Sequence, residues 1–378
     1  MEKSGITAVI LAAGYSERMG QFKPLLDLGG QPVVERIITS FRGAGIFDVR
    51  VVTGYRREIL VPVLERLGVK VIINDRYAEG MFSSVQAAVK SLDPSIGAFF
   101  LMPADVPLVR AETIRFLGES YNRHRGKILV PVFGGKRGHP PLIAARFAKA
   151  IMNYTGEGGL AGIFSLHSTH ILPVTVPDGN ILCDMDTPGD YADLQKRLQK
   201  MDVPTVAECE VMLREIQAAP DTLIDHSRAV AEVALFLVDE MNRHGFCIDR
   251  DLLLAAALLH DLAKGRSDHA LRSARMVREM GYERVAALVE THMDIVPGRG
   301  EEVTAAELLY LADKLVSGDR VVTLPERFGR AIEKYGDKPE TAGRIKIRHE
   351  NAISILNRIE ERTGPINFNS RAMAGAPL

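Results

Sequence analysis

Residues 6–26 read ITAVILAAGYSERMGQFKPLL. The apolar run at its start turns at Gly14, and Arg18 and Lys23 follow within ten residues of that turn. Ligands of open α/β sheets bind beyond the carboxyl ends of the strands, where glycine lets the backbone approach anionic oxygens. Arg and Lys can then neutralise phosphate charge. A surface loop with scattered charges would also fit, but the pattern favours a buried strand followed by a phosphate-binding loop. It is neither a P-loop nor a dinucleotide fingerprint.

The first half of the chain alternates apolar runs with amphipathic segments. Continuous runs rich in β-branched and aromatic residues are typical of strands covered on both faces. We expect strands at 6–12, 49–54, 69–74, 98–102 and 128–133, with helices such as 32–43 and 83–92 between them. Strands that alternate with helices predict an open, mainly parallel α/β sheet of the Rossmann-like kind.

Helical periodicity replaces this pattern near residue 200. The segment Thr205-Val-Ala-Glu208 predicts a capping box that begins a helix, and no later run is convincing as a strand. The last helix is expected around 342–361, followed by a frayed tail that contains Gly, Ala and Pro. The sequence thus predicts an α/β domain over 1–200 and an all-helical domain over 201–378.

Composition narrows the class of protein. The 378 residues carry a formal net charge of −1, which gives no global electrostatic reason to expect nucleic acid or an anionic membrane as a partner. Three separated cysteines without a CxxC pair argue against a disulfide scaffold or a cysteine zinc site. The longest apolar stretch, LLLAAALL at 252–259, is too short to span a bilayer. We therefore expect a cytoplasmic protein.

Three aspartates lie where a cation could bind in the first domain. Asp105 follows the apolar run FFLMP, and Asp184 and Asp186 alternate in an extended segment, so both can face one side. A lone Asp after a strand is more often a turn or cap residue. Carboxylates from two loops beside a phosphate site are nevertheless the hard oxygen ligands that Mg²⁺ requires. These residues predict a magnesium site.

Five motifs occur in a fixed order in this domain. They are LAAGYSERMGQFKPLL (11–26), NDRYAEGMFSSVQAA (74–88), FLMPADVPLV (100–109), GKRGHPPL (135–142) and DMDTPGDY (184–191). Together they resemble the MobA-like nucleotidyltransferases, in particular the molybdenum cofactor cytidylyltransferases, over roughly residues 5–195. The resemblance implies nucleotide contacts at Leu11, Ala12, Ala13, Gly14, Arg18, Lys23, Gly80, Ser83 and Ser84, Mg²⁺ contacts at Asp105, Asp186 and Asp184, and an acceptor contact at His139. A plain turn is the alternative role for His139.

The resemblance also implies an activity. A phosphate monoester would attack the α-phosphorus of an NTP and expel pyrophosphate, with Arg18, Lys23 and Asp105 as the catalytic residues. The LAAG spelling is similar to that of cytidylyl members, so CTP and molybdopterin are the expected substrates, and molybdoenzymes would receive the product. The alternatives are cytidylyl or uridylyl transfer to a sugar or polyol phosphate, and a nucleotide-sensing binding protein whose helical domain is an inactive scaffold.

Histidines and aspartates recur on apolar faces of the helical half. His226 shares the face of Val230, and Asp313 lies one turn after Leu309 inside the run LLYLADKLV. A single buried His is usually a satisfied core residue, but polar groups from several helices in one interior are costly unless they are paired. Metal coordination removes that cost, and imidazole with carboxylate suits Fe, Mn, Zn or Co.

These residues resemble the HD superfamily of metal-dependent phosphohydrolases over roughly 203–325. The resemblance implies metal ligands at His226, His260, Asp261 and Asp313, with His269 and His292 added if the site is dinuclear, as in HD-type diadenosine tetraphosphate hydrolases. One or two transition-metal ions are therefore expected, and Lys264 would be a catalytic residue that meets developing charge. A mononuclear site, with His269 merely solvated, is the other possibility.

Overall fold

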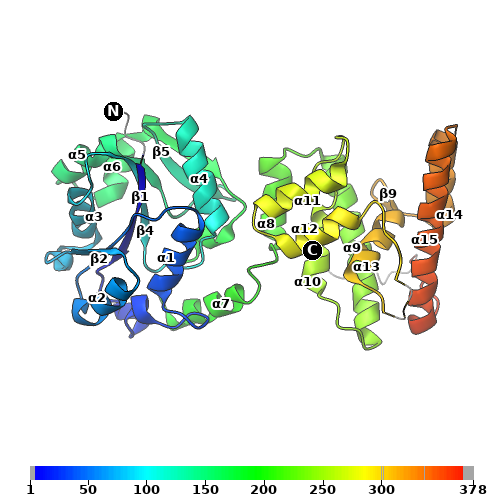
Figure 1. The fold of residues 1–378 in the computed structure, drawn as a ribbon, viewed down its shortest axis with the longest axis horizontal. Helices are drawn as coiled ribbons and strands as arrows, with labels where there is room; N and C mark the ends of the chain where they lie inside the picture. Colours follow the sequence, from blue (N-terminus) through cyan, green and yellow to red (C-terminus); the bar gives the residue numbers. More distant parts are fainter. Residues whose placement is uncertain (1–4, 299, 301, 336, 369–378) are drawn as a thin grey trace. The chain divides into compact units, whose positions relative to one another are not determined.

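The computed structural model describes residues 5–298, 300, 302–335 and 337–368. The chain divides into two compact units, Met1–Met201 and Asp202–Leu378. Each unit has its own hydrophobic core, and the two cores share no residue among those described. Figure 1 shows the elements of both units.

The first unit is built on a mixed sheet with the order β3-β2-β1-β4-β7-β5-β6, in which β8 pairs with β5. Its strands are β1 (Gly5–Ala12), β2 (Val49–Thr53), β3 (Lys70–Ile73), β4 (Ile96–Pro103), β5 (Ile128–Phe133), β6 (Lys136–Arg137), β7 (Leu142–Ala144) and β8 (Ile171–Thr175). The pairs β1–β2, β1–β4 and β2–β3 are parallel, as the apolar runs predict. The short strand β7 is antiparallel to both β4 and β5, so the sheet is mixed.

Helices cover both faces of this sheet (Figure 1). They are α1 (Val33–Gly43), α2 (Arg57–Arg66), α3 (Met81–Lys90), α4 (Ala111–Arg123), α5 (Ala148–Asn153), α6 (Gly159–Leu166) and α7 (Pro188–Leu198). Helix α1 packs with α4, and α3 packs with α5 and α6. Because both faces are covered, β1 and β4 are apolar along nearly their whole length and end together at one edge of the sheet.

The second unit is helical. Its helices are α8 (Val206–Val211), α9 (Asp221–Arg243), α10 (Arg250–Leu259), α11 (His269–Glu279), α12 (Glu283–Thr291), α13 (Ala305–Lys314), α14 (Leu324–Tyr335) and α15 (Pro339–Thr363). Thr205 and Glu208 form the predicted capping box at the start of α8. The expectation that no strand follows residue 200 is wrong in one place. There β9 (Val316–Ser317) and β10 (Arg320–Val321), of two residues each, pair as an antiparallel hairpin. From residue 369 on, the predicted tail lies outside the described residues.

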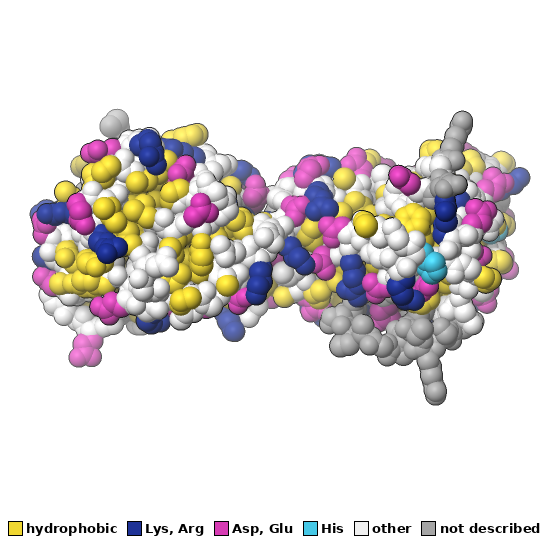
Figure 2. All heavy atoms as spheres, turned by 90° about the horizontal axis from the view of Figure 1, so that it is seen from below, with side chains coloured by type: hydrophobic (Ala, Val, Ile, Leu, Met, Phe, Trp, Pro, Cys, Tyr) yellow, Lys and Arg dark blue, Asp and Glu magenta, His cyan; other side chains and the backbone are white. Residues whose placement is uncertain are grey.

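Among the described residues, no helix combines the length and the apolar character needed to cross a lipid bilayer. On the face shown in Figure 2, basic and acidic side chains are interspersed on both units. This mixture agrees with the net charge of −1 and gives that face no extended field of one sign.

Candidate active sites

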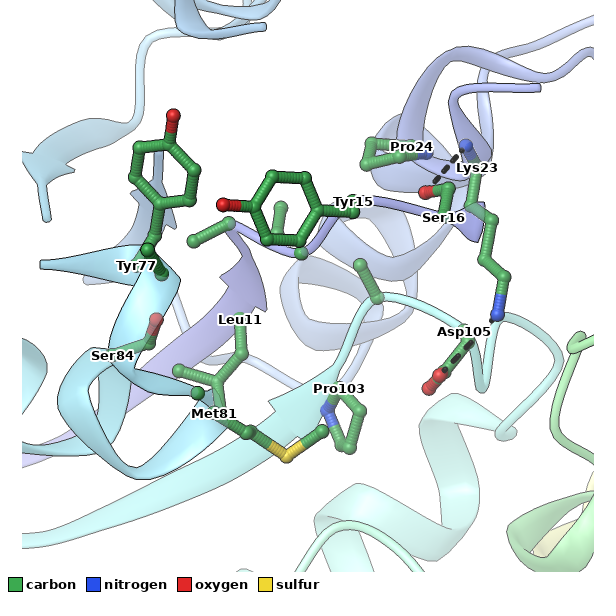
Figure 3. Close-up of a pocket in the computed structure, with 16 residues that line it drawn as sticks. Leu11, Tyr15, Ser16, Lys23, Pro24, Tyr77, Met81, Ser84, Pro103 and Asp105 are labelled. Carbon is green, nitrogen blue, oxygen red and sulfur yellow. Dashed lines mark hydrogen bonds and ion pairs between the residues drawn. The ribbon is translucent and has the colours of Figure 1, made fainter. Parts of the chain in front are cut away.

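The first site lies at the carboxyl ends of β1 and β4. A pocket of ≈ 320 Å³ opens there, and Figure 3 shows its tyrosines and Met81 on one side and Lys23 and Asp105 on the other. The lining consists of Leu11, Ala12, Ala13, Gly14, Tyr15, Ser16, Lys23, Pro24, Tyr77, Ala78, Gly80, Met81, Ser84, Pro103, Ala104 and Asp105. The strand-end position is the one expected for a ligand site in an open α/β sheet.

Lys23 joins two carboxylates at the charged end of this pocket. Its Nζ lies 2.7 Å from Oδ1 of Asp186 and 3.8 Å from Oδ2 of Asp105. A guanidinium nitrogen of Arg18 lies 2.8 Å from the other oxygen of Asp186, although the Arg18 side chain is 72% exposed. The structure thus brings together four of the residues predicted from sequence. Arg18 and Asp186 are not among the described residues that line the pocket itself.

The two carboxylates differ in their electrostatics. The hydrogen bond from Lys23 lowers the pKa of Asp186 below its ordinary value. Burial raises the pKa of Asp105, and the charge of Lys23 only partly offsets that effect. The carboxylates of Asp105 and Asp186 converge at Lys23. Such a pair also suits Mg²⁺, which takes hard oxygen ligands from few side chains. Asp184 is exposed, and its charge acts on both Asp105 and His139.

Ser83 and Ser84 are held in place by Asn74, a residue to which the sequence analysis assigned no role. Nδ2 of Asn74 donates to the hydroxyls of Ser83 and Ser84, at 2.9 Å each. Ser83 also donates to the carbonyl of Gly80, and of the two serines only Ser84 lines the pocket. Gly80 precedes α3 with φ +97°, a conformation that strains any residue with a Cβ. The geometry of this turn therefore depends on glycine at that position.

His139 lies away from the pocket lining. Its backbone N–H donates to the carbonyl of Ile181 at 2.9 Å, and no partner for its buried Nδ1 is found among the described residues. Burial lowers the pKa of His139, while Asp184 opposes the shift. A neutral imidazole with a free nitrogen could contact an acceptor, but the structure leaves the prediction for His139 open.

The second site gathers histidines and aspartates inside the helical unit. Two groups of side chains place their ligand atoms within 4.8 Å of one another. One group is His226, His260 and Asp261, and the other is Asp261, His269 and His292. Asp261 belongs to both groups. Oδ1 of Asp313 completes the cluster, 3.4 Å from Nε2 of His226 and 3.7 Å from Nε2 of His260.

Three of these histidines present a bare nitrogen to the cluster. Nδ1 of His226 lies 2.8 Å from the carbonyl of Gly318, Nδ1 of His260 lies 2.8 Å from that of Ala257, and Nδ1 of His292 lies 2.6 Å from that of Val289. No hydrogen-bond partner for the buried Nε2 atoms of these rings exists among the described residues. A carbonyl that accepts from Nδ1 leaves the lone pair of Nε2 for a metal. The residues present therefore fit a metal site.

The electrostatics of the cluster favour bound positive charge. Burial would raise the pKa of Asp261 and Asp313, but both lie well below the ordinary value. Neighbouring histidines lower the pKa of Asp261, and Lys314 with two histidines lowers that of Asp313. The same carboxylates raise the pKa of His260 against the effect of burial. The same negative charge would favour a metal ion at these nitrogens.

Two lysines flank the aspartates. Nζ of Lys264 lies 2.5 Å from Oδ2 of Asp261. Nζ of Lys314 lies 2.6 Å from Oδ2 of Asp313 and 3.2 Å from the carbonyl oxygen of His292. Sequence reasoning found Lys264 from its place in HDLAK but gave Lys314 no role, because a lysine inside a core helix carries no distinctive signal.

Fold and geometry define a class: an α/β nucleotidyltransferase domain followed by a helical domain with a buried His/Asp metal-site cluster. Residues 8–171 match the MobA-like NTP transferase domain and residues 223–318 match the HD domain. The chain is therefore a MobA-like NTP transferase domain fused to an HD domain.

Several known proteins are similar to the first domain. The molybdenum cofactor cytidylyltransferase of Escherichia coli (strain K12) is 29% identical over 197 residues, which cover 51% of this chain and 97% of that protein. A 2-aminoethylphosphonate cytidylyltransferase of Lancefieldella rimae is 32% identical, over 32% of this chain and 53% of that protein. A solved nucleotidyl transferase from Methanothermobacter thermautotroptrophicus is 22% identical with a TM-score of 0.46, and the match covers 52% of this chain and 99% of that one.

Proposed function

We propose that the first domain transfers a cytidylyl group from CTP to the phosphate of a molybdopterin-type cofactor and releases pyrophosphate. The observation that carries the proposal is the convergence of Lys23, Asp105 and Asp186 at the ends of β1 and β4, beside a pocket of ≈ 320 Å³. In this proposal the nucleotide lies against Leu11–Gly14, Gly80 and Ser84, with its phosphates toward Lys23 and Arg18. Ser83 supports the turn, and His139 lies toward the acceptor.

The chain's own residues account for the chemistry as follows. An oxygen of the acceptor phosphate forms a bond to the α-phosphorus of CTP, while the bond from that phosphorus to the bridging oxygen breaks and pyrophosphate leaves. The nucleophile is already anionic, so no side-chain base is needed. Lys23 and Arg18 neutralise charge that develops on the phosphates, and the pocket aligns the reacting groups. Asp105 and Asp186, with Asp184 nearby, would hold Mg²⁺, which supplies further charge neutralisation when bound.

The choice of substrates rests on similarity. The E. coli relative is a molybdenum cofactor cytidylyltransferase. The sequence of the turn Ala12-Ala13-Gly14 resembles that of cytidylyl enzymes. The L. rimae relative instead acts on 2-aminoethylphosphonate, and this favours as second candidate a cytidylyl or uridylyl transferase for another small acceptor, such as a sugar or polyol phosphate.

The test is a substrate screen with the full-length chain. Purified protein with Mg²⁺ is incubated with each of the four NTPs and with molybdopterin, sugar phosphates, polyol phosphates or 2-aminoethylphosphonate, and pyrophosphate and mass-spectrometric products are measured. We expect CTP and molybdopterin to give the cytidine dinucleotide form with the highest kcat/KM. A preference for GTP, or for another acceptor, would overturn the substrate assignment.

We infer that the second domain is a metal-dependent phosphohydrolase. The supporting observation is the set of three buried, unpartnered Nε2 atoms that face Asp261 and Asp313. His226, His260, Asp261 and Asp313 would hold a first ion, and His269 and His292 would add a second that shares Asp261. Fe, Mn or Zn bound there supplies Lewis acidity toward a phosphoryl group. An inactive nucleotide-sensing scaffold is less well supported, because a scaffold has no need of bare buried imidazole nitrogens.

A further inference from the structure

A hollow of ≈ 310 Å³ opens beside His226 in the helical domain. Its lining is Pro220, Thr222, Leu223, His226, Lys264, Gly265, Gly318 and Arg327. No Asp or Glu is among these described lining residues, whereas two of them carry a positive charge. The hollow therefore borders the His/Asp cluster at His226 and is lined by two cationic side chains.

Arg327 carries an unused donor. Its Nε is buried, and no hydrogen-bond partner for it exists in the described part of the chain. The residue lies on α14 between Leu324 and Phe328, which are both buried and fix the helix against the core. A buried N–H without an acceptor is energetically unfavourable. An anion in the hollow would remove that cost.

Lys264 lies between the hollow and the His/Asp cluster. Its side chain is 49% exposed, and its Nζ contacts Oδ2 of Asp261, a residue common to both candidate ligand groups. An ammonium group has three donors. Lys264 can therefore keep its contact with Asp261 and still donate to a ligand in the hollow.

We propose that this hollow is a phosphate-binding subsite in which Arg327 and Lys264 hold a terminal phosphoryl group of the substrate. Arg327 donates side-on, through Nε and one Nη, to two oxygens, as guanidinium does in bidentate phosphate recognition. Lys264 donates to the same group from the side of Asp261. Two cations match the charge of a terminal phosphate dianion better than that of an internal diester. The inference rests on the proposed hydrolase function and narrows its substrate to phosphomonoesters or terminal phosphates.

The test compares Arg327→Ala with Arg330→Ala, an exposed arginine on the same helix, in the full-length chain. Both are built in a Lys23→Ala background, so that the anion site of the first domain contributes little. Hydrolysis of p-nitrophenyl phosphate and of bis(p-nitrophenyl) phosphate, metal content, and calorimetric binding of inorganic phosphate are measured. We expect Arg327→Ala to raise KM for the monoester and to weaken phosphate binding about tenfold or more, the effect of losing one charged hydrogen-bonding partner.

Several outcomes separate the proposals. Arg327→Lys should recover part of the phosphate affinity, because it keeps the charge and loses the paired donors. Unchanged phosphate binding in Arg327→Ala at native metal content would overturn the subsite, as would a larger effect on the diester. Phosphate binding that depends on Arg327 in a chain that hydrolyses neither ester would uphold the subsite and overturn the hydrolase function.

Discussion

Asp105 and Asp186 illustrate how two residues of one type acquire different properties a few ångströms apart. Asp186 accepts a hydrogen bond from Lys23 and an ion pair from Arg18, and its pKa falls. Asp105 lies 3.8 Å from the same ammonium, and desolvation raises its pKa despite that charge. Asp105 is thus a charge that the fold tolerates at a cost, as is common for catalytic groups.

Asp105→Asn should make the metal-free protein more stable at neutral pH while it slows nucleotidyl transfer. Because the folded-state pKa of Asp105 is raised, its contribution to stability is present below the unfolded pKa and is lost as pH rises through the folded pKa. Neutralising the side chain removes that loss. Transfer should fall about 10²-fold, as when an electrostatic catalytic element is removed. Thermal unfolding with EDTA and pyrophosphate release measure the two effects.

Asp186→Asn is the matched comparison. The folded-state pKa of Asp186 is lowered, so its effect on stability at neutral pH has the opposite sign to that of Asp105. Its contribution is present above the unfolded pKa, so the substitution should lower the melting temperature at neutral pH. An Asp105→Asn protein that is less stable than the parent at pH 7, or that transfers at the parent rate, would contradict the assignment.

The positions of candidate site residues could be predicted where the chain itself brings them near a strand end. Lys23 and Asp105 follow β1 and β4, which are parallel neighbours, so their proximity is implied by the strand order. Asn74 and Arg327 could not be found in this way. Asn74 bonds to Ser83 and Ser84, which reach it through the packing of α3. Arg327 lines the same hollow as His226 because of where α14 packs.

At the scale of elements, helix α13 places Asp313 in the His/Asp cluster and begins with a capping box. Thr304 and Glu307 bond each other's backbone N–H groups. Glu307 is 2% exposed and also accepts from Gly298 and from Arg358, at 2.6 Å in the second case. Burial would raise the pKa of Glu307, but the bonds from Thr304 and Arg358 lower it. One carboxylate therefore ties the start of α13 to α15.

Glu307→Gln should lower the free energy of unfolding by about 1–3 kcal/mol at neutral pH, because buried partners lose a charged acceptor. The lowered folded-state pKa means that the contribution of Glu307 is present above its unfolded pKa and is lost as pH falls through the folded pKa. The difference between parent and variant should thus shrink below about pH 4.5. Denaturant unfolding of the helical domain at several pH values measures it.

Glu326→Gln is the control for this experiment. Glu326 makes the same capping bonds to Thr323 at the start of α14, but it is exposed. A loss in Glu326→Gln as large as that in Glu307→Gln would show that capping alone, and not the buried link to Arg358, accounts for the effect.

Helices and strands were predictable from sequence where an apolar run or a helical period was long enough. Five apolar runs became β1 to β5, and the capping box at Thr205 is present. The strands β6, β8, β9 and β10 were not predicted. Strand β8 is only partly buried and pairs with β5 alone, and β9 and β10 have two residues each. Strands this short leave no period to detect, and β8 is in addition set by pairing with a distant strand.

At the scale of the whole molecule, two cores carry two sites. The described core of the first unit ends at Leu194 and that of the second begins at Val203. The residues around Lys23 and those around Asp261 come from different cores. Damage to one site should therefore leave the other intact, unless the two activities are coupled in some further way.

His260→Ala combined with Asp261→Ala should abolish metal binding and phosphoesterase activity and leave nucleotidyl transfer largely unchanged. The pair removes one bare Nε2 and the carboxylate common to both candidate ligand groups. Metal content of the full-length chain is measured by atomic emission. The parent should retain close to two ions per chain if His269 and His292 bind metal, and one ion would favour the mononuclear site.

His244→Ala is the control for the double variant, since His244 is 39% exposed and bonds only within its own helical turn in the contacts described. It should keep metal, phosphoesterase and transferase at parent levels. If the double variant fails to fold in its helical domain, Asp313→Asn provides a milder removal of one ligand oxygen. Loss of nucleotidyl transfer in a double variant whose α/β domain remains folded would mean that the HD site controls the first reaction. Because the two cores are separate, that control would have to pass through a shared ligand or a motion between domains, and titrating CTP against metal content would identify it.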